Sequence, residues 1–85
     1  MERYKTAIDA ALDLRPDQPV YCFRPDVLRH DAQQFQSLFP GKTAYAVKTN
    51  GEPFVLEALA KAGISCFDVA SPAEFAAVKE AAPKA

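Results

Sequence analysis

The chain has 85 residues, of which 49% are hydrophobic and 25% charged, and its 10 Lys and Arg residues nearly balance 11 Asp and Glu residues. This balance, without a block of basic residues, argues against a nucleic-acid partner. No apolar run is longer than four residues, whereas a membrane span needs about 20 apolar residues and a signal peptide about 7 to 15. We therefore expect a cytoplasmic protein without a membrane partner. We also expect part of a longer protein, because so short a chain buries only about 60% of its unfolded surface.

The two cysteines, Cys22 and Cys66, lie far apart in the sequence. They lack the short paired spacing of zinc and redox sites. We interpret both as small buried thiols and expect no metal site.

The amino-terminal residues predict a lead-in of one helix and one strand. From Tyr4 to Leu12 the apolar residues recur at helical spacing, and this pattern stops before Arg15-Pro16. The run Val20 to Phe23 is β-branched and aromatic, and its length suits one buried strand. We assign this lead-in to residues 1–24 and the start of a second domain to residues 25–85.

Residues 25–85 predict alternating helices and strands. Pro25 opens a helix that Pro40-Gly41 ends, and its apolar stripe consists of Leu28, Ala32, Phe35 and Phe39. The expected elements that follow are a strand over 43–48, a helix starting near Pro53, a strand over 65–69, and a helix from about Pro72 to Ala81. Ser71-Pro72-Ala73-Glu74 is a capping box for the last helix.

The predicted strand, helix and strand from Thr43 to Val69 have the length of one βαβ unit. Two parallel strands leave exposed edges and faces, so this architecture requires further strands. A complete (β/α)8 TIM barrel needs about 250 residues. We therefore predict an α/β fold, namely the beginning of an incomplete barrel that contains its first two strands with their helices.

Lys48 ends the first of these predicted strands, and active sites of βα barrels lie at the carboxyl ends of strands. Ala44 and Ala46 share its strand face and leave space there. Asp68 ends the next strand, where it would face the lysine. A partly desolvated lysine amine suits Schiff-base chemistry. On the pattern alone, however, a lysine at a strand end is more commonly solvated, and Asp68 is more commonly a turn-forming or salt-bridging acid. Helix capping alone accounts for Glu74.

The stretch Tyr45-Ala46-Val47-Lys48-Thr49-Asn50, followed by Phe67-Asp68-Val69-Ala70-Ser71 and Glu74, closely resembles the fold-type III pyridoxal-phosphate decarboxylases. This family has an alanine racemase-like barrel and includes ornithine, lysine, arginine and diaminopimelate decarboxylases. The resemblance runs from about Pro19 to the end of the chain. It implies that Lys48 is catalytic and holds pyridoxal 5'-phosphate as a Schiff base. Asp68 and Glu74 match acids that the family keeps near that lysine.

Within the family, Ser71-Pro72-Ala73-Glu74 lacks the glycines of the diaminopimelate branch, and residues 67–71 resemble the ornithine and lysine branch more. The resemblance thus implies a carboxy-lyase that converts ornithine to putrescine and CO₂ for polyamine synthesis, a homodimer when full length. The family's phosphate loop and pyridine partner match nothing in these 85 residues, so we expect the isolated chain to be inactive. Two alternatives stay open: a diaminopimelate decarboxylase or another enzyme of this cofactor and fold, and a non-catalytic relic or binding module.

Overall fold

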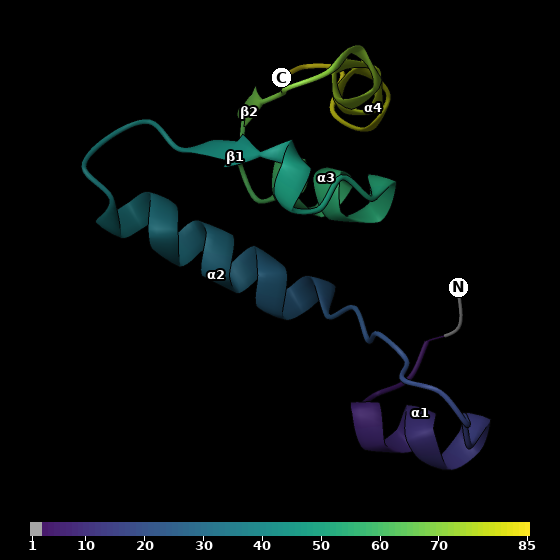
Figure 1. Cartoon of the computed structure of the whole chain (residues 1–85). Coiled ribbons are helices and arrows are strands. Elements are labelled where there is room, and N and C mark those ends of the chain that lie inside the picture. Colours follow the sequence, from purple (N-terminus) through teal and green to yellow (C-terminus); the bar gives the residue numbers. More distant parts are fainter. Residues whose placement is uncertain (1–2) are drawn as a thin grey trace.

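The computed structural model describes residues 3–85, so residues 1–2 of the predicted lead-in lie outside the described residues. Helices and strands alternate in most of the chain, which confirms the α/β prediction (Figure 1). None of the described helices is long and apolar enough to cross a membrane. The elements are, in order, α1 (Ala7–Leu14), α2 (Pro25–Leu38), β1 (Ala44–Ala46), the 3-10 turn η1 (Val47–Thr49), α3 (Pro53–Lys61), β2 (Cys66–Asp68) and α4 (Pro72–Ala81).

Helix α1 forms where the apolar spacing predicts a helix, displaced by two or three residues toward the carboxyl end. Thr6 sets its start, because the Thr6 hydroxyl accepts a hydrogen bond from the Asp9 N–H at 3.1 Å. Arg15 ends the helix in a left-handed conformation with φ of 45°. The apolar side chains of Ile8 and Leu12 are 70% and 65% exposed. In Figure 1, α1 lies apart from both strands, so it contributes little to the main core.

The prediction of a strand at Val20 to Phe23 was wrong. These residues form an irregular segment in which Tyr21 is fully exposed and Val20 is 53% exposed. A strand requires a hydrogen-bonding neighbour, and in the described residues β1 and β2 pair only with each other. Phe23 alone reaches the core region, where its ring lies 4.7 Å from that of Phe54. The interpretation of Cys22 as a buried thiol was also wrong, because this residue is exposed; Cys66 on β2 is half-buried.

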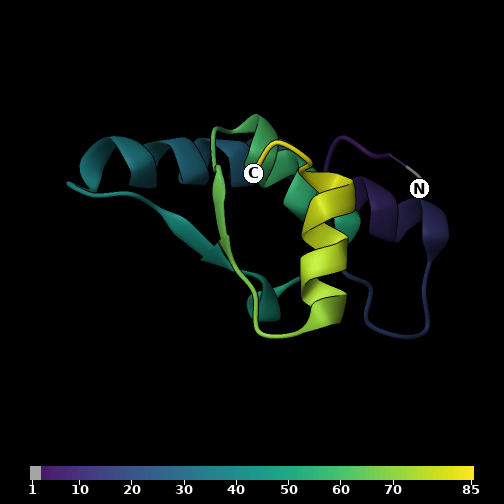
Figure 2. The same cartoon turned by 90° about the horizontal axis from the view of Figure 1, so that it is seen from above.

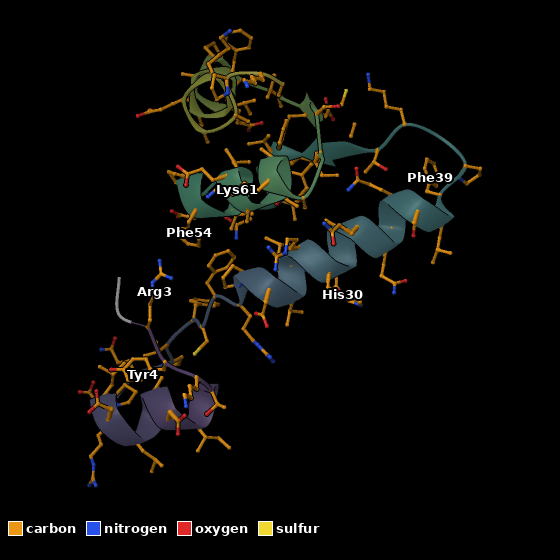
Figure 3. All side chains as sticks on the ribbon, turned by 180° about the vertical axis from the view of Figure 1, so that it is seen from behind. Arg3, Tyr4, His30, Phe39, Phe54 and Lys61 are labelled. Atoms are coloured by element: carbon orange, nitrogen blue, oxygen red, sulfur yellow. The ribbon has the colours of Figure 1, made fainter. Side chains whose placement is uncertain are left out.

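Helix α2 begins at Pro25, as predicted, since proline lacks an N–H that a first helical turn would leave unpaired. Its apolar stripe is only half covered. Leu28 and Ala32 pack against the core, whereas Phe35 and Phe39 stack on each other at 5.2 Å and are 54% and 45% exposed. Figure 3 shows Phe39 at the far end of α2, where the chain turns back toward β1.

Strands β1 and β2 are parallel, and α3 is the crossover helix between them. The register pairs Ala44 with Cys66, Tyr45 with Phe67, and Ala46 with Asp68. Both strands are shorter than predicted, because the chain leaves β1 at Val47 and enters the tight turn η1. Helix α3 contacts both α2 and α4 and lies between them (Figure 1).

The core lies between the sheet and the helices and consists of two clusters that share two aromatic residues. Tyr45 and Phe67 pack against both clusters, and their rings meet edge to face at 6.2 Å. Leu56 at 0% and Val47 at 1% exposure are the most deeply buried large side chains. One cluster consists of Val47, Leu56, Val78 and Ala82, and the other of Val55, Leu59 and Ile64.

We expect Leu56→Ala to reduce the free energy of unfolding by about 2–5 kcal/mol, because it removes fully buried methyl groups and leaves a cavity. Leu38→Ala is the matched control. Leu38 is 77% exposed, and its truncation should change stability by no more than about 0.5 kcal/mol. Urea unfolding followed by far-ultraviolet circular dichroism measures both variants. Equal effects of the two substitutions would contradict this position of the core.

Candidate functional site

Lys48 lies in η1, directly after the carboxyl end of β1. Its side chain is exposed. Within residues 3–85 it makes no hydrogen bond and no ion pair. No side chain of the described residues therefore holds the amine, and its position depends on the backbone of η1.

Two contacts fix that backbone on either side of the lysine. Val47 is 1% exposed and belongs to the first core cluster. The Tyr45 hydroxyl donates a hydrogen bond to the Asn50 carbonyl oxygen at 3.0 Å. Burial raises the pKa of the Tyr45 phenol above its ordinary value, so this donor stays protonated at neutral pH. Asn50 also forms a local turn, since its Oδ1 accepts from the Glu52 N–H at 3.1 Å.

A shallow hollow of about 300 Å³ lies beside the lysine. Figure 2 shows the turn after β1 next to the first turn of α4, and the hollow lies between these two segments. Three of its six lining residues are glycine or alanine, which leaves room beside the amine. The lining residues are Val47, Lys48, Gly51, Ala73, Glu74 and Ala77.

Glu74 reaches this hollow from α4 and also caps that helix. Its N–H donates to the Ser71 hydroxyl at 3.1 Å, so the predicted cap at Ser71 is confirmed. Its Oε1 accepts from the Ala70 N–H at 2.9 Å rather than from the N–H of Ser71. The second carboxylate oxygen has no hydrogen bond within the described part of the chain. The structure thus brings Glu74 and Lys48 to one hollow.

Asp68 lies at the end of β2 and is exposed. It pairs in register with Ala46, two positions before the lysine, and it does not line the hollow. No ion pair joins Asp68 to Lys48 in residues 3–85. The alternation of strand side chains applies only up to Ala46, because η1 then changes the direction of the chain.

Sequence reasoning missed two residues of this site, the Tyr45 hydroxyl and Gly51. From the sequence, Tyr45 is only part of the stretch that resembles the family, and no known spacing signals a bond from its hydroxyl to a backbone carbonyl five residues on. A Cβ at Gly51 would lie 3.3 Å from Val47 Cγ1, so glycine allows the turn to approach the core closely.

His30 lies on the side of α2 turned away from α3 and is exposed (Figure 3). It lies outside the hollow. In residues 3–85 no group of three or more His, Cys, Asp or Glu side chains has the geometry of a metal site.

The fold and the site together define an α/β domain that presents a free lysine amine at the end of a parallel strand. Residues 26–85 match the family model described as "pyridoxal-dependent decarboxylase, pyridoxal binding domain". This match spans most of the chain, and the chain belongs to this family. No curated protein and no solved structure matched the chain significantly. The predicted cofactor, pyridoxal 5'-phosphate, is confirmed by the family, since the matched domain is the one that binds it.

The residues of the hollow fit the carbonyl end of this cofactor. Lys48 supplies an amine that has no partner among residues 3–85, and Gly51, Ala73 and Ala77 leave space beside it. The lining contains no arginine, and Glu74 would repel a phosphate group. When bound, pyridoxal phosphate withdraws electrons from the bonds to the α-carbon of an amino acid. This hollow therefore contains one lysine amine and one acid.

We expect Glu74→Ala to destabilise the chain by about 0.5–2 kcal/mol, because the Ala70 N–H loses its acceptor at the start of α4. Glu74→Gln keeps an oxygen at that place and should retain most of the stability. Urea unfolding curves measure both variants, with Glu80→Ala on the exposed side of α4 as control. Equal losses for Ala and Gln at position 74 would contradict a capping contact.

Proposed function

We propose that this chain is the amino-terminal part of a pyridoxal-phosphate-dependent amino-acid decarboxylase, in which the Lys48 amine holds the cofactor. The observation that carries this proposal is the free amine of Lys48 beside a hollow, inside the domain that matches the family. Its location after β1 also agrees with active sites at the carboxyl ends of barrel strands.

In this proposal β1 and β2 are the first two strands of an alanine racemase-like (β/α)8 barrel. Their parallel pairing and the crossover through α3 support it. The face of the sheet opposite the core supports it too, because its side chains are small or polar and none is buried. This face consists of Ala44, Ala46, Cys66 and Asp68.

The three acidic and basic residues then have distinct roles. Lys48 forms the covalent bond to the cofactor. Glu74 accepts a hydrogen bond or a proton at its free carboxylate oxygen in the same hollow. Asp68 supplies negative charge at the neighbouring strand end. Of the two acids, only Glu74 lines the hollow beside Lys48.

For the substrate we propose ornithine, with putrescine and CO₂ as products and polyamine synthesis as the context. The support is local sequence: Ser71-Pro72-Ala73-Glu74 lacks glycine, unlike the diaminopimelate branch. We further propose that the complete enzyme is a cytoplasmic homodimer.

The covalent role of Lys48 is tested by incubating the chain with pyridoxal phosphate, reducing with borohydride and mapping the phosphopyridoxyl group by peptide mass. The lysine amine adds to the cofactor aldehyde, water leaves, and hydride from borohydride makes the carbon–nitrogen bond permanent. We expect label mainly on Lys48 among the six lysines, and loss of this selectivity in Lys48→Ala. Lys42→Ala, in the exposed loop before β1, is the control. Equal labelling of all six lysines would refute the assignment.

We also expect the isolated 85-residue chain to release no CO₂ from ornithine. The hollow contains no arginine to hold the phosphate, so the cofactor would be poorly oriented even when attached to Lys48. The measurement is CO₂ release from carboxyl-labelled ornithine, compared with free pyridoxal phosphate at the same concentration. Release above that background would show that these residues suffice for catalysis.

A further inference from the structure

The direction of the Lys48 side chain depends on contacts that its neighbours make. The side chain itself has no hydrogen bond or ion pair in the described part of the chain. The residue lies in a three-residue turn, η1, which supplies little regular hydrogen bonding of its own. The position of the amine therefore depends on the contacts that fix the two ends of this turn.

The first end of the turn is held by apolar burial. Val47 precedes the lysine and is packed with Leu56 and Val78. Gly51, just after the turn, permits close approach to Val47, since a Cβ there would lie 3.3 Å from Val47 Cγ1. Burial fixes where the turn begins, whereas Thr49, Asn50 and Gly51, on the other side of Lys48, are all exposed.

The second end is held by the hydrogen bond from the Tyr45 hydroxyl to the Asn50 carbonyl, 3.0 Å long. This bond joins the middle of β1 to the residue after η1 and closes a ring of chain that contains Lys48. The tyrosine is itself fixed, because its ring meets Phe67 edge to face and packs against both core clusters. A rigid donor on the strand thus holds the exit of the turn.

We propose that the Tyr45 hydroxyl is a positioning group for Lys48: by holding the Asn50 carbonyl, it keeps the lysine amine directed into the hollow that Glu74 also lines. This inference rests on the proposed role of Lys48 as the cofactor-binding residue. Tyr45 touches neither the hollow nor the amine, so it acts through the backbone of the turn. Phenylalanine at this position would keep the ring contacts and lose only the hydroxyl.

The test compares Tyr45→Phe with the unaltered 85-residue chain, both loaded with pyridoxal phosphate. Two quantities are measured: the share of borohydride-trapped label on Lys48 among the six lysines, and the circular dichroism induced in the absorption band of the bound cofactor. We expect both to fall by a factor of about 2 or more, which corresponds to the loss of a weak ordinary hydrogen bond. Tyr21→Phe, which alters a fully exposed tyrosine, should leave both unchanged.

Phe67→Leu separates positioning from stability, because it loosens the packing of Tyr45 and keeps the hydroxyl. We expect it to lower the free energy of unfolding more than it lowers the Lys48 share. If the Lys48 share instead follows stability through Tyr45→Phe and Phe67→Leu alike, the hydroxyl has no positioning role and the inference is overturned.

A second variant weakens the same hydrogen bond from its other side. Chemical synthesis with an ester in place of the amide between Asn50 and Gly51 makes the Asn50 carbonyl a weaker acceptor and retains Tyr45. This variant should also reduce the Lys48 share, and it decides the question if Tyr45→Phe does not fold. An unchanged Lys48 share in the folded ester variant overturns the inference. Absence of any Lys48 preference in the unaltered chain would instead refute the proposed function.

Discussion

The packing of one face of a two-stranded parallel sheet on helices determines most of this structure. Tyr45 and Phe67 face each other across the strands and contact both core clusters, and Val47 continues the same apolar surface beyond the end of β1. Parallel strands need a crossover, which α3 provides, and its Leu56 is the most deeply buried residue. Because Val47 must face the core, the next residue along the turn, Lys48, is left exposed beside α4.

Helix boundaries were the most predictable part of the fold, because local chemistry sets them. Pro25 and Ser71 mark helix starts through a missing N–H and a side-chain acceptor, and neither signal needs distant residues. Strands were harder to predict. The run Val20 to Phe23 has strand-like residues and still forms no strand, since a strand exists only with a hydrogen-bonding neighbour. The same dependence shortens β1 and β2 to the residues that pair with each other.

The candidate site was predictable to the extent that it follows from strand geometry. The pattern of residues 43–48 sufficed to place Lys48 near the carboxyl end of a strand, but β1 ends at Ala46 and Lys48 itself lies in η1. Its proximity to Glu74 depends on how α4 packs over the turn, and no sequence spacing encodes that packing. The expected facing of Lys48 and Asp68 assumed regular alternation along β1, and this alternation stops where η1 begins. The sequence pattern thus placed the lysine, and tertiary packing determined that Glu74 is its neighbour in the hollow.

The sheet face opposite the core contributes little to the stability of the chain. Its Ala44 and Ala46 bury too little apolar area to stabilise a layer, and Asp68 beside them carries a charge that resists burial. The space beside Lys48 lies elsewhere, toward α4, and Gly51, Ala73 and Ala77 leave it open. The uncovered sheet face and the hollow are therefore separate features. The small strand residues determine the first, and the packing of α4 over η1 determines the second.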